Sequence, residues 1–335
     1  GIKFNSNFQW STTSRDVKDG NAGHITREPE QVKAFRDTWR DGIHSYLTYL
    51  RDRLTVIRDL LSDSGSVIVQ IGEENCHLIR SLLDEVFGAE NFVSQIIFSK
   101  TASATSEYLA GTYDVLVLYA KSRERLKYRQ PLTLKKIGGA GGSAYKRLRL
   151  ADLSERVLVA EEIAGTRALP DSSRVFRIDN LTSQSMGRDK GEGAASWFPV
   201  LFEGQTIRPS EKVRWKTNEQ WMARLHKAAR LAATGKGLYY VRYFDDFEAF
   251  PEDNVWSDTG IAGFASEKRY VVETSEKVVQ RCILMTTDPG DLVLDPTCGS
   301  GTTATVAEQL GRRWITIDTS RVALALARAR IMGAR

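Results

Sequence analysis

Apolar positions in the first hundred residues follow a helical spacing in two places. Between residues 43 and 62 they lie three or four positions apart, which puts one set on a single helix face: Tyr46, Leu47, Leu50, Leu54, Ile57 and Leu61. A second helix is predicted at 74–86, and Gly88 follows as a residue suited to end it. Both patterns predict helices that turn one apolar stripe toward a core.

Shorter apolar runs predict strands around these helices and again near the C-terminus. The runs lie at 66–71, 93–98, 114–120, 292–294 and 313–317. A last helix is predicted at 320–332, with a buried stripe of Val322, Ala325, Leu326 and Ala329. Residues 1–35 are polar and are expected to form loops.

The middle of the chain, residues 123–265, is richer in arginine, glycine and aromatic residues. A helix is predicted there at 217–233, on the apolar set Trp221, Leu225, Ala228 and Ala232, and a strand at 237–243. Tryptophans of such a domain belong to the core more often than to a base-stacking surface. Core positions are therefore expected for Trp215, Trp221 and Trp256.

Composition limits the class of protein. A chain of 335 residues with 41% hydrophobic residues can bury a large core and is expected to form two domains. It contains no apolar run of about 18 residues, so no membrane span is expected. The cysteines Cys76, Cys282 and Cys298 are far apart, show no metal-ligand spacing and suit the reduced cytoplasm.

Positive charge is concentrated in one segment. Residues 121–149 carry a net charge of +9, with Glu124 as the single acid, so the rest of the chain carries −4 of the total +5. The cations are Lys121, Arg123, Arg125, Lys127, Arg129, Lys135, Lys136, Lys146, Arg147 and Arg149. If residues 121–129 are extended, their alternating cations project from one face. Such a row suits the phosphates of duplex DNA, and the alternative is a solvated charged surface.

The sequence LVLDPTCGSGTT at 292–303 carries the clearest chemistry. A short strand leads to Asp295, and glycines 299 and 301 allow backbone N–H groups to approach a ligand closely. The third glycine of the dinucleotide motif and the lysine of a phosphate-binding loop are absent, which argues against NAD and ATP. Asp318 lies 19 residues after Gly299, near the spacing at which a carboxylate meets a ribose. The alternative role, capping the last helix, suits Ser320 better.

These motifs resemble those of a known family. DPTCGSGTT (295–303) is similar to the cofactor motif of amino-DNA methyltransferases that use S-adenosylmethionine, in the subgroup with a late cofactor motif. SEKVVQRCILMTTDPGD (275–291) resembles the helix before that motif, and residues 44–93 resemble the family's N-terminal helix–strand–helix block. YDVLVLYAKS (113–122) is similar to its next strand. The modification subunits of type III restriction systems are the most similar subgroup.

The resemblance implies an α/β fold: a Rossmann-like methyltransferase sheet with circularly permuted motif order and an inserted target-recognition domain. The methyltransferase parts are then residues 1–122 and 266–335, and the insertion is 123–265. The implied cofactor-binding residues are Asp295, Pro296, Thr297, Cys298, Gly299, Ser300, Gly301, Thr302, Thr303 and Asp318. No histidine partner for Cys298 is apparent, so this cysteine is expected to be a small turn residue and not a nucleophile.

Two further pairs are candidates for the same cleft. Thr274 and Ser275 are expected near the methionine end of the cofactor or, equally, as caps of the following helix. Glu73 and Glu74 are expected to face the cleft or to interact with the dipole of a helix that starts there.

The chain departs from the family in one respect. The catalytic tetrapeptide Asp-Pro-Pro-Tyr, or a relative of it, occurs nowhere in the sequence. The first residues, GIKFNSNFQW, resemble the segment that follows the tetrapeptide, so Gly1 is expected to be a truncation point. No residue is therefore assigned a catalytic role, and the chain alone is expected to be inactive.

The resemblance implies methyl transfer from S-adenosylmethionine to the exocyclic amine of adenine in duplex DNA, as part of a restriction-modification system. Cytosine is the alternative target, and a catalytically incomplete DNA- and cofactor-binding fragment is a second alternative. An enzyme acting on RNA or a small molecule is a third, which the basic segment disfavours. A restriction subunit and a second copy of the chain are candidate partners.

Overall fold

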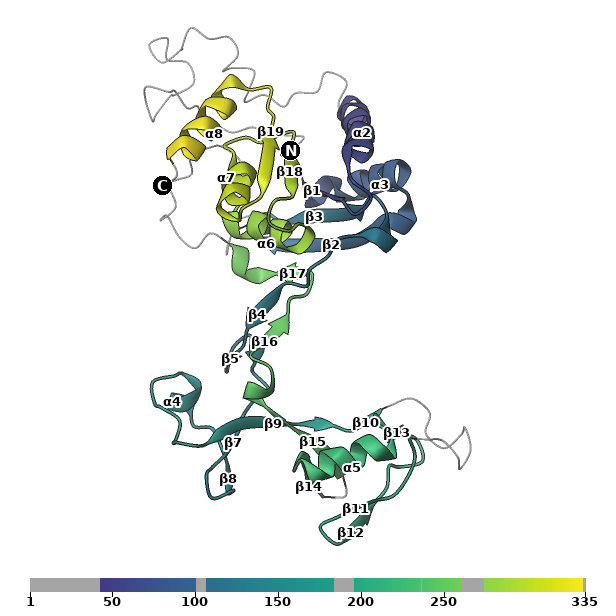
Figure 1. The fold of residues 1–335 in the computed structure, drawn as a ribbon, viewed down its shortest axis with the longest axis vertical. Coiled ribbons are helices and arrows are strands. Elements are labelled where there is room, and N and C mark those ends of the chain that lie inside the picture. The colour runs from purple at the N-terminus through teal and green to yellow at the C-terminus, as the bar shows by residue number, and fades with distance from the viewer. Residues whose placement is uncertain (1–42, 101–106, 184–195, 236, 261–273, 334–335) are drawn as a thin grey trace. The chain divides into compact units, whose positions relative to one another are not determined.

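The computed structural model describes residues 43–100, 107–183, 196–235, 237–260 and 274–333. The chain divides into two compact units, which are drawn in Figure 1. Unit 1 comprises Gly1–Pro131 and Glu252–Arg335, and unit 2 comprises Leu132–Pro251. Unit 2 lies within the insertion expected at 123–265 and is shorter at both ends.

The larger sheet of unit 1 has the strand order β1 (Ser66–Gly72), β3 (Tyr113–Ala120), β2 (Phe92–Ser99) and β17 (Val255–Trp256). β3 is antiparallel to both β1 and β2, and β17 is parallel to β2. Helices α2 (Ile43–Leu60) and α3 (Cys76–Phe87) supply Leu54, Ile79 and Leu83 to a core that also holds Tyr119 of β3. The helices and strands predicted for this region are confirmed within a few residues.

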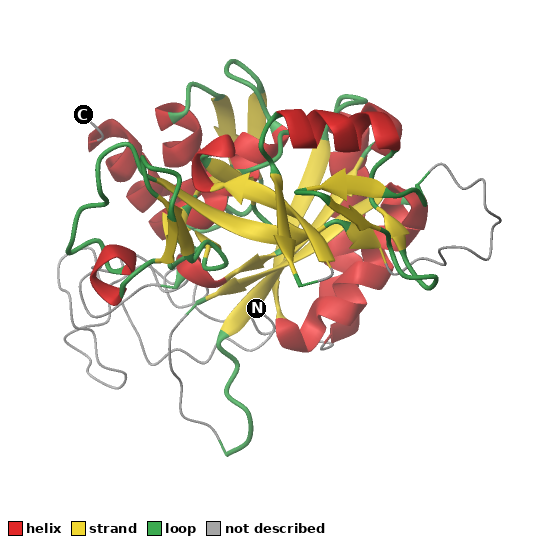
Figure 2. Ribbon diagram, turned by 90° about the horizontal axis from the view of Figure 1, so that it is seen from below, coloured by secondary structure: helices red, strands yellow, loops and turns green. Residues whose placement is uncertain are grey.

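The second sheet of unit 1 pairs β18 (Leu292–Asp295) with β19 (Arg313–Thr316) in parallel, and α7 (Thr302–Gln309) connects them. Helix α6 (Glu276–Thr286) packs Val278 and Met285 with the larger sheet and Ile283 with α7. The described strands of unit 1 form two sheets, and β1 and β18 each lie at an edge. The described residues of unit 1 combine α-helices with strands, whereas those of unit 2 form mostly strands. Figure 2 shows the helices in red and the strands in yellow.

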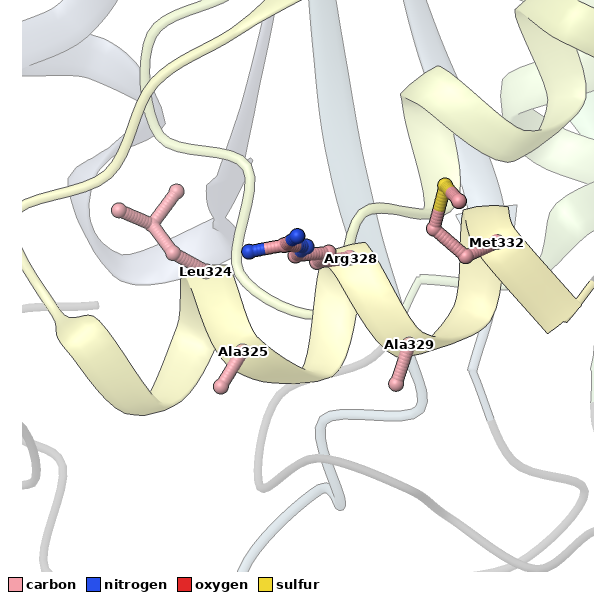
Figure 3. A pocket seen from close by; sticks show the side chains of 5 residues that line it. All are labelled: Leu324, Ala325, Arg328, Ala329 and Met332. Atoms are coloured by element: carbon pink, nitrogen blue, oxygen red, sulfur yellow. The ribbon is translucent and has the colours of Figure 1, made fainter.

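Helix α8 (Arg321–Gly333) buries a different stripe from the one predicted. Val322 is buried as expected, but Ala323 and Ala327 are buried in place of Ala325 and Ala329. The prediction was wrong because the alanine at 327 packs closely against Gly301 and so sets the rotation of the helix. The outer face forms an open depression of about 540 Å³, lined by Leu324, Ala325, Arg328, Ala329 and Met332 (Figure 3).

Unit 2 is built around a five-stranded antiparallel sheet. Its order is β14 (Leu231–Thr234), β15 (Gly237–Tyr243), β9 (Arg174–Asn180), β7 (Arg147–Arg149) and β8 (Glu155–Val157). Short pairs accompany it: β4 (Leu132–Leu134) with β16 (Ala249–Pro251), β5 (Lys136–Ile137) with β6 (Gly141–Gly142), β10 (Thr182–Ser183) with β13 (Arg214–Trp215), and β11 (Val200–Phe202) with β12 (Gln205–Ile207). The α-helices among the described residues of unit 2 are α4 (Ala160–Ile163) and α5 (Glu219–Lys227). The strand predicted at 237–243 is confirmed.

The helix predicted at 217–233 is too long. Helix α5 ends at Lys227, and Ala229 adopts a left-handed conformation with φ of 53°, which reverses the chain into β14. Strand pairing with β15 overrides the helical propensity of the alanines that follow. Trp221 is 53% exposed, so its predicted core position was wrong, whereas Trp215 and Trp256 are buried as predicted.

In unit 2, Arg156 forms an ion pair with the buried carboxylate of Glu162. Glu162 of α4 has a side chain with 0% exposure, and its carboxylate accepts hydrogen bonds from Arg156 at 2.6 and 2.8 Å. The backbone N–H of Val159 donates to the same carboxylate at 3.1 Å. The bonds from Arg156, supported by the bond from Val159, lower the pKa of Glu162 to about 2.

The buried pair predicts how the stability of unit 2 depends on pH. The pKa of Glu162 lies below its ordinary value of 4.5, so the unfolded chain takes up this proton first as the pH falls. The stabilisation is complete above the unfolded pKa and is lost as the pH falls from there through about 2. Thermal unfolding should show a fall in melting temperature over this window that is smaller in Glu162→Gln. An equal fall in both proteins would contradict the assignment.

Candidate cofactor site

The turn after β18 is held by the backbone of the strand beside it. The N–H of Cys298 donates to the carbonyl of Ile317 at 3.0 Å, and the N–H of Ile317 donates to the carbonyl of Asp295 at 2.9 Å. Gly299 and Gly301 have φ of 51° and 77°, a region that residues with a Cβ rarely adopt. The glycines are thus required by the turn itself, which ends where α7 begins.

Gly301 is also required by packing. A Cβ at this position would lie 2.7 Å from the Cβ of Ala327 and 3.0 Å from its Cα. The glycine therefore lets the backbone of the turn approach α8 more closely than any side chain would permit. This approach fixes the turn against the last helix.

Asp318 closes the turn from the end of β19. One oxygen, Oδ2, accepts the N–H of Gly299 at 2.9 Å, and Oδ1 accepts the N–H of Ser320 at 2.8 Å. The hydroxyl of Ser320 accepts the N–H of Ala323 at 3.3 Å and caps α8, as predicted. A carboxylate has about four acceptor positions, so Asp318, which is half-buried, retains acceptor capacity for a ligand.

The predicted cofactor residues divide by exposure. Thr297 is exposed, and Asp295, Pro296, Gly299, Thr303 and Asp318 are half-buried. Cys298, Ser300, Gly301 and Thr302 are buried. The carboxylate of Asp295 accepts the N–H of Thr297 at 3.1 Å, which shapes the start of the turn. Only the half-buried and exposed members present atoms at the surface of the site.

The buried members have structural partners. Burial raises the pKa of the Cys298 thiol, which keeps the sulfur protonated and agrees with its expected role as a turn residue. Ser300 and Thr302 accept hydrogen bonds from Nη1 of Arg330, at 3.3 and 2.9 Å. The structure therefore places these hydroxyls toward α8 and not toward an open site.

Arg330 was missed by sequence reasoning. Its side chain is 8% exposed, and its other guanidinium nitrogen, Nη2, donates to Glu276 of α6 at 2.5 Å. It thus joins the turn, α6 and α8. The only sequence signal was a cation in the last turn of a helix, which is usually explained by the helix dipole.

A group of ion pairs holds the segment of chain that leads into β18. Lys127 contacts Asp291 at 2.5 Å and Asp288 at 3.2 Å, and Arg129 contacts Asp288 at 3.2 Å. The hydrogen bond to Asp291 is the main cause that raises the pKa of Lys127. These pairs join residues about 160 positions apart and anchor the turn at 288–291.

The basic segment does not form the extended row of cations considered above, because Arg123–Arg125 is a short 3₁₀ helix. Two more of its cations form ion pairs, as Lys127 and Arg129 do. Arg125 pairs with Asp63 at 2.5 Å, and Arg149 pairs with Glu155 at 2.6 Å. Lys121 donates to the carbonyl of Leu61 at 2.5 Å, and Lys135 donates to that of Phe244 at 3.2 Å. Arg147 lies 3.8 Å from Glu155, and Arg123, Lys136 and Lys146 are the exposed remainder. DNA binding by this segment stays a prediction.

The other candidate pairs lie in unit 1. The Thr274 hydroxyl donates to the side-chain carbonyl of Gln70 in β1 at 2.7 Å. Ser275 is the residue before α6 but makes no side-chain capping bond. Glu73 and Glu74 begin a 3₁₀ helix after β1, and a hydrogen bond to Glu73 raises the pKa of Tyr113.

The described residues hold neither a metal-binding cluster nor a membrane-spanning helix. They contain no group of three or more His, Cys, Asp or Glu side chains placed to hold a metal ion. None of the described helices combines the length and the apolar character needed to cross a bilayer.

A family model described as DNA methylase (N6_N4_Mtase) matches residues 24–329. The type II methyltransferase M.EcaI of Enterobacter cloacae is 26% identical over 291 residues, which cover 82% of this chain and 55% of the relative. The probable type III restriction-modification enzyme HindVI Mod subunit of Haemophilus influenzae is 24% identical over 327 residues, covering 82% of this chain and 42% of that protein.

The chain thus spans about half the length of these curated relatives. Among solved structures, the M1.HpyAVI–SAM complex matches with a TM-score of 0.41 and 11% identity, covering 85% of this chain and 82% of the other.

Proposed function

The chain belongs to the DNA methylase family, and from this premise we propose that it binds S-adenosylmethionine at residues 295–303 and Asp318. The proposed reaction is methyl transfer to an exocyclic amine of a DNA base in a restriction-modification system. The observation that carries the proposal is the hydrogen bond from the N–H of Gly299 to Asp318. This bond places a carboxylate that can accept further hydrogen bonds directly beside the glycine turn.

The residues present fit this cofactor. The half-buried carboxylate of Asp318 would accept the ribose hydroxyls, and Gly299 leaves the backbone open to close approach. Asp295 and Thr297, at the start of the turn, would contact the remainder of the molecule. When bound, the cofactor supplies an electrophilic methyl group. The contribution of these residues is to hold that group in place, and positioning accounts for a large part of such catalysis.

Adenine is the proposed target base, on the resemblance to type III modification subunits, and cytosine is the alternative. A restriction subunit is a proposed partner, supported by relatives that are named as Mod subunits of restriction-modification enzymes. A homodimer and a cytoplasmic location are retained as predictions.

Two measurements test the proposal. Calorimetry should show that the 335-residue chain binds S-adenosylmethionine, and an absence of binding would overturn the cofactor assignment. A methyl-transfer assay on duplex DNA should show no turnover by this chain alone, because no Asp-Pro-Pro-Tyr sequence is present to receive the amine. Turnover would contradict that expectation and would point to a catalytic residue not yet assigned.

A further inference from the structure

The central strands of unit 2 carry arginines on both faces of the sheet, and the faces differ in how those charges are balanced. On the face that carries Tyr243, three arginines each form an ion pair with a carboxylate. The pairs are Arg149 with Glu155 at 2.6 Å, Arg174 with Asp245 at 2.9 Å, and Arg230 with Asp246 at 2.7 Å. Arg174 and Arg177 alternate along β9, so they point to opposite faces. The charges of the three arginines on the Tyr243 face are therefore balanced, and we call it the paired face.

On the second face, two arginines share one carboxylate. Arg177 of β9 and Arg242 of β15 are direct cross-strand partners. Both contact the same oxygen of Asp179, Oδ2, at 2.9 and 3.4 Å. Like charges placed directly opposite in a sheet are destabilising, and one carboxylate offsets only one of them. A positive charge is therefore left over at this position.

Lys135 adds to this charge. Burial, followed by the charge of Arg242, lowers the pKa of Lys135, and Arg177 acts in the same direction, while the carboxylates of Asp246 and Asp245 oppose this shift. Its Nζ lies 5.2 Å from the ring centre of Tyr145, and Arg177 lies 5.1 Å from the same ring. Lys135, Arg177, Arg242 and Asp179 form a cluster with a net charge of +2, which we call the cationic cluster.

The guanidinium groups of the cationic cluster are incompletely satisfied. Within the described residues, the Nε atoms of Arg177 and Arg242 are buried and have no hydrogen-bond partner. The two side chains are nevertheless 28% and 38% exposed, so their outer nitrogens are open to a ligand. A buried donor without a hydrogen-bond partner is costly, and an ion that binds at the site is one explanation for keeping it.

We propose that the cationic cluster binds a backbone phosphate of duplex DNA. A phosphate oxygen would lie between the outer nitrogens of Arg177 and Arg242 and supply the negative charge that Asp179 alone cannot. Arginine is suited to this ligand because its planar fork of donors matches phosphate geometry. The inference rests on the proposed function for DNA as the substrate, and it assigns to Arg177 and Arg242 a role outside the basic segment 121–149.

The test measures the salt dependence of DNA binding by the full 335-residue chain. Fluorescence anisotropy with a labelled duplex gives the slope of log K against log salt, which changes by about 0.9 for each phosphate contact. Arg242→Gln should make the slope shallower by about that amount. Arg174→Gln, which removes the same charge from the paired face, should leave it unchanged. Equal slopes for Arg242→Gln and wild type, or an equal change in Arg174→Gln, would overturn the proposal.

Asp179→Asn supplies a test of opposite sign. Removing this carboxylate raises the charge of the cationic cluster from +2 to +3, so the variant should bind duplex DNA more tightly than wild type. A purely structural role for the cluster predicts equal or weaker binding, and that result would overturn the proposal. Arg242→Lys keeps the charge and should retain the wild-type slope, which separates a charge effect from misfolding.

Two controls separate the possible failures. If wild type binds no DNA at any salt concentration, this inference fails, and so does the proposal that the protein acts on DNA. Calorimetry with S-adenosylmethionine tests the proposed cofactor site independently. If inorganic phosphate binds wild type but not Arg242→Gln, and DNA binding is the same in both proteins, the cluster is a small-anion site and the proposal is overturned.

Discussion

Gly301→Ala should destabilise unit 1 by about 2–5 kcal/mol. The new Cβ would lie 2.7 Å from the Cβ of Ala327 and 3.0 Å from its Cα, and rotation of a side chain cannot relieve contact with a backbone atom. Overpacking of this kind costs about 1–3 kcal/mol. A residue with a Cβ at a φ of 77° adds about 1–2 kcal/mol. Denaturant unfolding measures the loss, and calorimetry should show weaker binding of S-adenosylmethionine.

Gly311→Ala is the matched control. Gly311 has a φ of 71°, and an added Cβ would meet no atom within 4 Å. The control therefore incurs the backbone cost of about 1–2 kcal/mol without the clash. If the two variants lose equal stability, close contact between the turn and α8 contributes nothing, and the packing argument for Gly301 fails.

Asp318→Ala should weaken binding of S-adenosylmethionine by about 10- to 100-fold. The change removes the proposed acceptor of the ribose hydroxyls, and a hydrogen bond to a charged group contributes about 1.5–3 kcal/mol. It also removes the acceptor for the N–H groups of Gly299 and Ser320, so the turn loses its closing bond. Calorimetry gives the dissociation constant of each variant.

Two comparisons assign the effect to its cause. Asp318→Asn keeps one acceptor oxygen for the turn but loses the charge, so its affinity should fall between those of wild type and Asp318→Ala. Glu308→Gln removes the same charge from the exposed side of α7, where Glu308 accepts the indole N–H of Trp314 at 2.8 Å. It should bind like wild type. Undiminished affinity in Asp318→Ala would end the proposed role of this carboxylate.

Local spacing predicted the elements that position the site. The strands at 292–295 and 313–316, the glycine turn and the Ser320 cap all follow from a few neighbouring residues. Glycine torsions and helix caps are short-range properties, so no information from the rest of the fold is needed. The carboxylate 19 residues beyond Gly299 was located in the same way, and its bond to that glycine is present.

Partners distant in the chain were not predictable from spacing. Lys127 and Arg129 looked like part of a cationic surface, but acids at 288 and 291 pair with them. A run of cations shows nothing about the carboxylates that the fold brings to it. The same limit applies to Arg177 and Arg242, which are 65 positions apart in sequence and become cross-strand partners only when β9 and β15 pair.

The position of the glycine turn, the strands beside it and the acid that contacts it can be read from the amino-acid sequence, because they depend on backbone torsions and short spacings. The buried face of α8, the end of α5 and the unbalanced cations are set by the folded chain. Those outcomes depend on contacts such as Ala327 with Gly301 and β14 with β15, and on pairing energies that arise when distant segments meet.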